Sequence, residues 1–273
     1  MGTLKTMTIT QKKKQGYNTT GRSHKEGVKN EQFTADMLNK LNVYTEEVIL
    51  RGGTRNKEDA IADPYELGFK LKKGKGNGSF DWGNLGRQAH YFHPYFTEWK
   101  SKIAQWRTLP DSIRYDEQFH DMVDQIFANY CSAALDQITS DELIQVLKEG
   151  FVEPLYTHHI WVRDSVSEEL YRFMFKDHPA VRYIQNGFTA RLVNASGIAK
   201  TSRKIVFNDG VTDYECGLRF RLTSNNGTSA FLGAPKKKGG NKNGSVTIKL
   251  QQDGVTKLLS TVGAEVYNYR ALV

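Results

Sequence analysis

Asp59 and Lys70 lie in a stretch of the chain whose pattern predicts a β-hairpin. If the two predicted strands pair so that these side chains face each other, an acid and a lysine meet at one point of a sheet, with Glu66 nearby. Such a pair is either a surface salt bridge, which contributes little to stability, or a polar group suited to acid–base chemistry. The elements that position these side chains therefore decide which interpretation applies.

Three short β-like runs surround the pair, at residues 48–51, 59–62 and 65–72. The last run alternates strictly, with aromatic or aliphatic side chains on one face and polar side chains or glycine on the other. Asp63 and Pro64 indicate a turn between the second and third runs. We therefore expect an antiparallel hairpin here.

The expected register of this hairpin determines which side chains meet. A tight hairpin looped at residues 64–65 pairs Asp63 with Glu66 and places Asp59 opposite Lys70. Side chains paired in this way have Cβ atoms about 4.5–5.5 Å apart. A slip of one residue would move Asp59 and Lys70 to opposite faces of the sheet.

A helix is expected before these strands. Residues 23–26 fit a capping box, and an apolar stripe then continues to about Asn42. Glu31 lies at the flank of this stripe on a helical wheel. It is either a solvated surface residue or a carboxylate at the edge of the surface on which the helix packs.

Bulk composition predicts a folded protein of a reducing compartment. The chain has 273 residues, of which 38% are hydrophobic and 11% aromatic. No apolar run is long enough to span a membrane, and the N-terminus has no apolar segment typical of a secretory signal. Cys131 and Cys216 are far apart, which argues against a disulfide framework or a thiolate zinc site. We expect a cytoplasmic protein.

Positive charge is concentrated in parts of the chain. The formal net charge is +8 and the pI is about 9.3. Residues 1–30 carry seven Lys or Arg against one acid, residues 235–250 carry five Lys and no acid, and residues 111–149 carry nine acids against two basic residues. This distribution indicates either binding to a polyanion or a charge pattern that favours solubility.

Several basic residues lie where a nucleic-acid backbone could approach. Some belong to loops with glycine, in which Phe80 and Trp82 are interleaved, and others to the polar face of predicted C-terminal strands. The same alternation describes any sheet with one solvated face. The candidate nucleic-acid-binding residues are Arg51, Arg55, Lys57, Lys72, Lys73, Lys75, Arg219, Arg221, Lys236 and Lys249.

The rest of the chain is expected to be helical and then β-rich. We expect helices over 111–138, from 139 to about 150, and from 165 to before 177, with a strand over 158–162. Further strands are predicted at 188–193, 204–207, 214–223, 228–232 and 245–251, with a hairpin turn at 225–227. The chain is thus divided into a flexible basic arm (1–22), a core (23–110), a helical segment (111–180) and a β-rich part (181–273) that is either separate from the core or continuous with it.

The order of a capped helix with a flank glutamate, a strand, a strand bearing an aspartate and a strand bearing a lysine resembles the PD-(D/E)XK nuclease superfamily, which includes type II restriction endonucleases. The resemblance covers about residues 23–75. It implies an α/β (α+β) fold with a restriction-endonuclease-like mixed-sheet core flanked by helices, followed by a β-rich recognition part.

By this resemblance, Asp59 is the metal-binding aspartate and Lys70 the motif lysine. Gly68 occupies the position of the second motif acid, which is a departure from the family pattern. Glu31 resembles an acid that has migrated to the first helix, and Glu66 is the alternative. The cofactor implied is Mg²⁺ or Mn²⁺, which takes oxygen ligands and polarises the phosphate, while the lysine orients water and stabilises charge.

The resemblance therefore implies a Mg²⁺-dependent endonuclease that cuts double-stranded DNA sequence-specifically as a homodimer. The amphipathic pattern of helix 111–138 makes it a candidate interface. The alternative is a non-catalytic DNA- or RNA-binding protein that uses a basic β-sheet face. A third interpretation, a structural or assembly protein, predicts no salt-dependent affinity for DNA.

Overall fold

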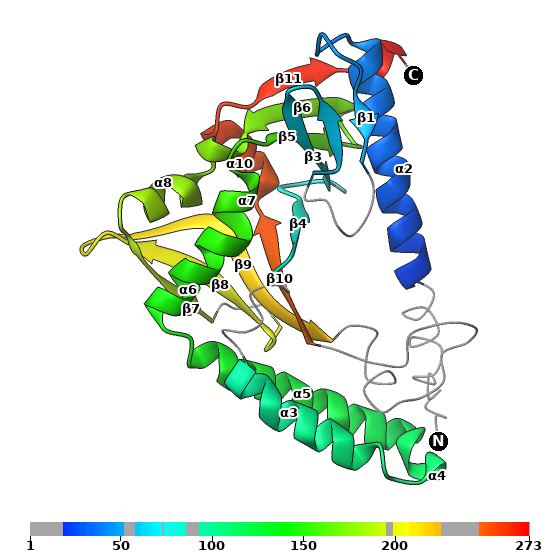
Figure 1. Ribbon diagram of the computed structural model, residues 1–273, viewed down its shortest axis with the longest axis vertical. Coiled ribbons are helices and arrows are strands. Elements are labelled where there is room, and N and C mark those ends of the chain that lie inside the picture. The colour runs from blue at the N-terminus through cyan, green and yellow to red at the C-terminus, as the bar shows by residue number, and fades with distance from the viewer. Residues whose placement is uncertain are drawn as a thin grey trace, which may run out of the picture.

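The computed structural model describes residues 19–51, 58–72, 74–85, 93–194, 199–224 and 246–272. It is a mixed α+β structure with two β-sheets (Figure 1). The first sheet has the order β1-β2-β3-β5-β6-β11. It is mixed, because β3 and β5 pair in parallel while all other neighbouring strands of this sheet pair antiparallel. The second sheet, β4-β10-β9-β8-β7, is antiparallel throughout.

The first sheet is built from strands that are far apart in the sequence. Its strands are β1 (Ile49–Leu50), β2 (Ala60–Ala62), β3 (Tyr65–Lys72), β5 (His159–Asp164), β6 (Glu169–Met174) and β11 (Glu265–Asn268). Helix α2 (Thr19–Lys40) lies beside this sheet in Figure 1. Its Leu38 belongs to the same buried cluster as Leu67 of β3 and Trp161 of β5, so α2 covers one face of the sheet.

The second sheet packs against the other face of the first in one large core. Its strands are β4 (Ser79–Asn84), β7 (Thr189–Val193), β8 (Ser202–Asn208), β9 (Asp213–Ser224) and β10 (Val246–Asp253). Ile160 and Val162 of the first sheet share a buried cluster with Phe220 and Leu250 of the second. The alternation expected of a sheet with one solvated face is present in β9 and β10, where the buried side chains are Leu218, Phe220, Leu222, Ile248 and Leu250.

Helices cover the outside of this core. The longer ones are α3 (His93–Trp106), α5 (Glu117–Asp136) and α6 (Ser140–Leu147); the shorter ones are α4 (Asp111–Arg114), α7 (Glu153–Leu155), α8 (Pro179–Gln185) and α10 (Val255–Thr261). A π-helical turn occupies Lys148–Val152, and 3₁₀ turns occupy Phe175–Asp177 and Arg270–Leu272. Figure 1 shows the pair α3 and α5 at the end of the molecule opposite the first sheet.

Four expected elements differ from the structure. The helix start expected at residues 23–26 is wrong, because α2 begins at Thr19 and these residues lie inside it. The helix expected after residue 165 is strand β6, because Asp164 Oδ1 accepts the backbone N–H groups of Val166 and Ser167 and closes a turn back to β5. The expected loop with glycine in which Phe80 and Trp82 are interleaved contains strand β4. The long helix expected over 111–138 is divided into α4 and α5, because Asp116 caps a new helix by accepting the N–H of Phe119.

The strands do not follow the expected division of the chain. Strand β4 comes from the N-terminal part but lies at the edge of the second sheet, and β11 comes from the C-terminal part but lies at the edge of the first. Within the segment 111–180, β5 matches the strand expected there, but β6 lies where a helix was expected. The boundaries expected at residues 110 and 180 therefore do not separate the two sheets.

Candidate functional site

The hairpin of β2 and β3 forms at the expected place but in a different register. Ala62 pairs with Tyr65 and Ala60 with Leu67, so Asp63 does not pair with Glu66. The ladder ends at Ala60, so the expected pairing of Asp59 with Lys70 is wrong. The physical reason is that Asp63 and Pro64 themselves form the two-residue turn, which shifts the pairing by two positions.

Asp59 has a structural partner in this arrangement. Its Oδ2 accepts the backbone N–H of Phe69 at 2.6 Å, and its own N–H donates to the carbonyl of Leu67 at 2.9 Å. The carboxylate therefore binds an amide of β3 beyond the point where regular pairing with β2 has stopped. A buried or partly buried N–H without a partner is costly, so this contact stabilises the end of the hairpin.

Glu66 lies beside a buried histidine. Its Oε2 is 3.4 Å from Nδ1 of His158, in an orientation that makes no hydrogen bond with either ring nitrogen. Burial lowers the pKa of His158, and the negative charge of Glu66 opposes that shift in part. His158 is 2% exposed and lies directly before β5, so burial favours the neutral ring.

A second group of polar side chains lines a cleft of about 510 Å³ between α2, β3 and the second sheet. Glu31 comes from α2 and Lys70 from β3, so the structure brings together these two sequence-predicted residues. Asp59 and Glu66 are not part of the lining. The other polar residues of the cleft are Asn30, Ser79, Asp81, Arg221 and Gln251.

The register of the second sheet explains why its side chains converge on this cleft. Gln251 of β10 pairs with Asp81 of β4 on one side, and Lys249, two positions away on the same face, pairs with Arg221 of β9. Residues two apart on a strand share a face, so these side chains form one polar surface on the face opposite the core.

Two cations in the cleft make no ion pair with the residues that the structure describes. The Nζ atom of Lys70 lies 5.8 Å from the ring centre of Trp82, and Arg221 is exposed. Each adds a positive charge that an anionic ligand can approach. A phosphate group matches both a lysine ammonium and an arginine guanidinium.

The sequence-predicted metal set is not assembled around Asp59. Among the described residues, no three His, Cys, Asp or Glu side chains lie close enough together to hold a metal ion. Glu31 lines the cleft, whereas Asp59 is bound to the N–H of Phe69 and Glu66 lies beside His158.

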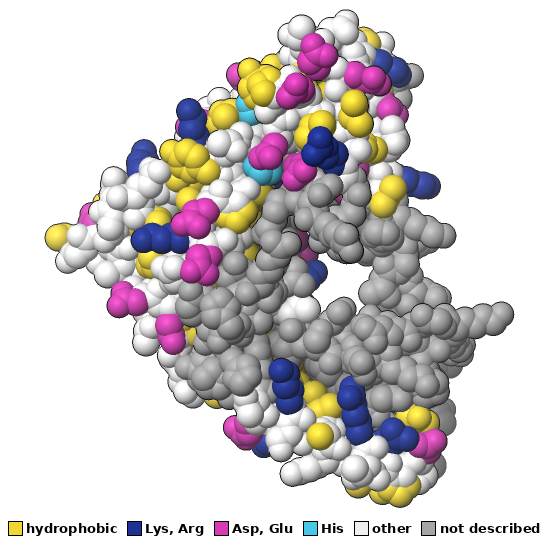
Figure 2. Space-filling view, viewed as in Figure 1, with side chains coloured by type: hydrophobic (Ala, Val, Ile, Leu, Met, Phe, Trp, Pro, Cys, Tyr) yellow, Lys and Arg dark blue, Asp and Glu magenta, His cyan; other side chains and the backbone are white. Residues whose placement is uncertain are grey.

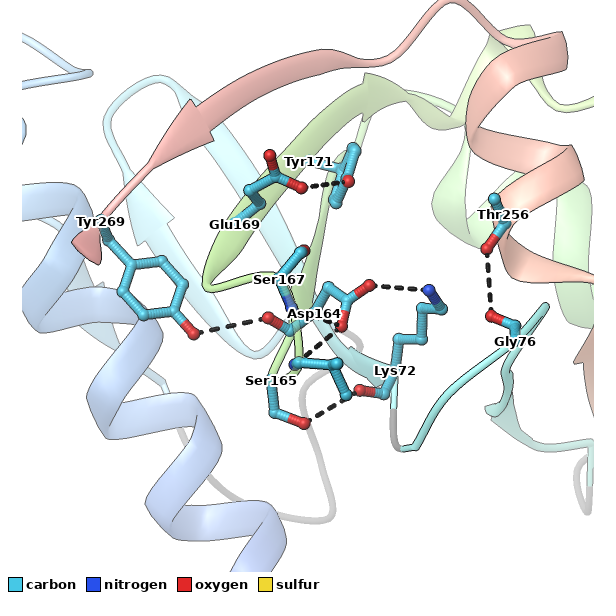
Figure 3. Close-up of polar contacts among 10 residues, drawn as sticks. Lys72, Gly76, Asp164, Ser165, Ser167, Glu169, Tyr171, Thr256 and Tyr269 are labelled. Carbon is cyan, nitrogen blue, oxygen red and sulfur yellow. Dashed lines mark hydrogen bonds and ion pairs between the residues drawn. The ribbon is translucent and has the colours of Figure 1, made fainter.

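Lys72 does not fit its expected contact with a nucleic acid. Its Nζ donates to Asp164 Oδ2 at 2.7 Å, and both side chains are buried (Figure 3). The hydrogen bond from Lys72 lowers the pKa of Asp164, and those from the N–H groups of Val166 and Ser167 lower it further, against the opposing effect of burial. The pair joins β3 to β5, so Lys72 is excluded from the candidate surface.

The other candidate nucleic-acid-binding residues have different environments. Arg51 and Lys75 are exposed, and Arg51 lies 3.7 Å from Glu58. Arg219 is paired with Asp253, and Lys249 lies 3.4 Å from Asp81, so acids accompany part of the basic sheet face. Arg55, Lys57, Lys73 and Lys236 lie outside the described residues, as do the strand expected at 228–232 and the turn at 225–227.

Asp81, Asn30 and Gln251 were not singled out from the sequence. The signal for Asp81 was present, because buried Phe80 and Trp82 alternate with polar Ser79 and Asp81 in the pattern of a strand. The surrounding glycines suggested a loop instead. No sequence pattern predicts that Asn30 is buried, because its burial depends on how α2 packs.

Comparison with known proteins gave no match, whether to a protein-family model, a curated protein or a solved structure. The helices in the described part of the chain include none with the length and apolar character needed to cross a membrane.

Proposed function

We propose that this chain is a Mg²⁺-dependent endonuclease that hydrolyses DNA phosphodiester bonds, with a catalytic core similar to that of type II restriction enzymes. The observation that carries the proposal is that Glu31 and Lys70, from different elements, line one cleft. The order of α2, the antiparallel strands β1 to β3, and β5 in parallel with β3 also supports a core of this kind.

Each residue has a defined part in this proposal. Mg²⁺ would supply charge stabilisation at the phosphate and a more acidic water molecule. Glu31 offers the carboxylate oxygens that this ion prefers. Lys70 would orient the attacking water and stabilise the negative charge that develops on the phosphate oxygens. Arg221, on the opposite sheet, would hold the phosphodiester in the cleft.

Sequence-specific cleavage of both strands by a homodimer belongs to the same proposal. On the segment expected to form the interface, Ile113, Tyr115 and Met122 expose 43%, 41% and 43% of their surface. An exposed apolar patch is typical of a contact surface, and these side chains are the candidates for one on this segment.

The proposal is tested by incubating plasmid and phage DNA with the protein in Mg²⁺ or in EDTA. We expect discrete fragments in Mg²⁺ alone. Because Lys70 would act mainly in the transition state, Lys70→Ala should lower the cleavage rate by about 100-fold or more, with a much smaller loss of DNA binding. Lys176→Ala is the matched control, since Lys176 is exposed and does not line the cleft.

A non-catalytic DNA- or RNA-binding protein is the second candidate. This candidate is favoured by the hydrogen bond from the N–H of Phe69 to Asp59, because it engages the carboxylate that was expected to bind the metal. This candidate predicts binding that weakens steeply with salt and no cleavage under any metal condition. Wild-type protein that binds DNA but leaves the plasmid intact in both Mg²⁺ and Mn²⁺ would support it over the endonuclease.

A further inference from the structure

We infer that Glu31 and Asp81 form a two-carboxylate site for a divalent cation, and that Lys70 and Arg221 hold a phosphate group beside that cation. The identity of the phosphate as part of DNA rests on the proposed function. The cation site itself does not. Asp81 thereby takes the part that the resemblance had given to Asp59, and it comes from β4, a strand outside the β2–β3 hairpin.

The hairpin itself has no place for the second acid. Gly68 occupies the motif position, and a Cβ atom there would lie 3.0 Å from Cδ1 of Ile160 in the neighbouring strand. An acidic side chain at this buried position would be both crowded and desolvated. Asp59 is bound to the N–H of Phe69, and Glu66 lies outside the cleft beside His158.

Asp81 is placed to supply the missing charge. It lines the same cleft as Glu31 and Lys70, and its side chain is 49% exposed. Its ion pair with Lys249 is 3.4 Å long and solvent-exposed, so the contact is weak and leaves the carboxylate available to a ligand. Buried Trp82, the next residue, fixes the backbone of β4 at this point.

A third oxygen donor in the cleft points independently to a ligand. Asn30 is 5% exposed and lines the cleft, and its Oδ1 atom accepts no hydrogen bond from the residues that the structure describes. A buried acceptor without a donor is rare, because its desolvation costs about 1–3 kcal/mol. A cation, or a water molecule bound to one, would satisfy it.

The cleft therefore offers two carboxylates and an amide oxygen. This set suits Mg²⁺ or Mn²⁺, which bind through one or two carboxylates, retain several waters and complete their shell with phosphate oxygens. Two carboxylates are also consistent with the finding that no three acidic, histidine or cysteine groups cluster in the described part of the chain. Lys70 and Arg221 then compensate the charge of the phosphate that the cation attracts.

The site is tested by titrating Mn²⁺ alone into the full chain, without nucleic acid, and measuring its affinity by calorimetry and by water-proton relaxation. We expect wild-type protein to bind Mn²⁺, and Asp81→Asn and Glu31→Gln each to weaken binding by about tenfold or more. Asp63→Asn, in the exposed hairpin turn, is the matched control and should not change the affinity. Asp59→Asn should also bind Mn²⁺ nearly as well as wild type.

The inference is overturned if wild-type protein binds no Mn²⁺ at millimolar concentration, if Asp81→Asn binds it as tightly as wild type, or if Asp59→Asn alone removes binding. Circular dichroism establishes that each variant is folded, and Asp81→Glu, which keeps the charge, should retain more affinity than Asp81→Asn. If Mn²⁺ binding depends on Asp81 but the protein cleaves no DNA, the site stands and the proposed function fails. If DNA is cleaved equally well by Asp81→Asn, the proposed function stands and the site fails.

Discussion

Three side chains in the core, His178, Gln252 and Trp82, form a hydrogen-bonded group with one consistent arrangement of protons. The amide nitrogen of Gln252 donates to the carbonyls of Cys216 and Asp253, both at 2.9 Å. Its oxygen is therefore the acceptor for the Trp82 indole at 3.2 Å and for Nε2 of His178 at 2.9 Å. The other ring nitrogen of His178 accepts the N–H of Ala180, so the ring fits only in its neutral form.

This arrangement predicts an acid-sensitive fold. Burial lowers the pKa of His178 to about 4, well below its ordinary value of 6.5. The unfolded chain binds a proton here at a higher pH than the folded chain does. The free energy of unfolding is therefore unaffected by protonation of this histidine above about pH 6.5. It decreases by up to about 3 kcal/mol as the pH falls towards 4. Urea unfolding between pH 7.5 and 4.5 measures this dependence.

The contribution of His178 is isolated with His178→Asn, which cannot titrate and can still accept the N–H of Ala180. We expect a less stable variant whose unfolding free energy falls less steeply with decreasing pH. His159, whose pKa is also lowered to about 4, leaves a residual slope in the variant. An unchanged slope in His178→Asn would show that other groups control the acid sensitivity.

The site residues could be predicted only in part, because sequence pattern does not fix register. The side-chain types around Asp59 and Lys70 indicated a polar site, and Glu31 and Lys70 do line one cleft. The hydrogen bond of Asp59 to Phe69, however, follows from the position of the turn, which composition does not determine. Asp81 reaches the cleft through pairing of β4 with a strand about 170 positions later in the sequence, a contact beyond the range of local patterns.

At the scale of elements, alternation and capping were reliable where local chemistry decides the structure. Strand β3 has the expected bounds, and the capping box of α6 is present, with Thr139 and Glu142 binding each other's backbone N–H. Residues 165–168, directly before β6, also fit a helix cap. Pairing of β6 with β5 outweighs this signal, since a strand in the sheet gains more than an isolated helical turn would. Pairing with β5 therefore determined β6, whereas the break between α4 and α5 follows from the local cap at Asp116.

The close approach of β9 and the end of β10 depends on a glycine. Gly217 has a φ of 78°, and a Cβ atom there would lie 2.2 Å from the carbonyl oxygen of Asp253 and 2.5 Å from the amide of Gln252. Gly217→Ala should therefore separate the strands and weaken the core group around Gln252. Gly210→Ala is the control, since Gly210 has a φ of 99° and nothing within 4 Å of the same position.

Backbone strain should lower the free energy of unfolding of both variants by about 1–3 kcal/mol. Overpacking should lower it by about a further 1–3 kcal/mol in Gly217→Ala alone. Thermal or urea unfolding of the two variants measures the difference. Equal losses of stability would show that β9 and β10 can move apart at no cost, and the close approach would then be unimportant for the fold.

At the scale of the whole molecule, the charge is distributed unevenly over a surface that carries both signs. Figure 2 shows Lys and Arg side chains along the pair α3 and α5 with acids beside them, and acids and bases are interspersed over the described surface of the rest of this face as well. The net charge of +8 therefore does not spread a uniform positive potential over the described residues. Affinity for a polyanion should depend on particular cations, of which Lys70 and Arg221 line the cleft.

The dependence of DNA affinity on salt tests this placement. Each phosphate contact releases counterions, so the logarithm of affinity falls with the logarithm of salt concentration with a slope of about −0.9 per contact on duplex DNA. Arg221→Ala should weaken binding uniformly across sequences and reduce the size of the slope by about 1. Fluorescence anisotropy in EDTA, between low and physiological salt, measures both without cleavage. Lys176→Ala is the control, because it removes an equal charge outside the cleft and should leave the slope unchanged. Equal changes of slope in the two variants would mean that DNA responds to the net charge of the protein and does not enter the cleft.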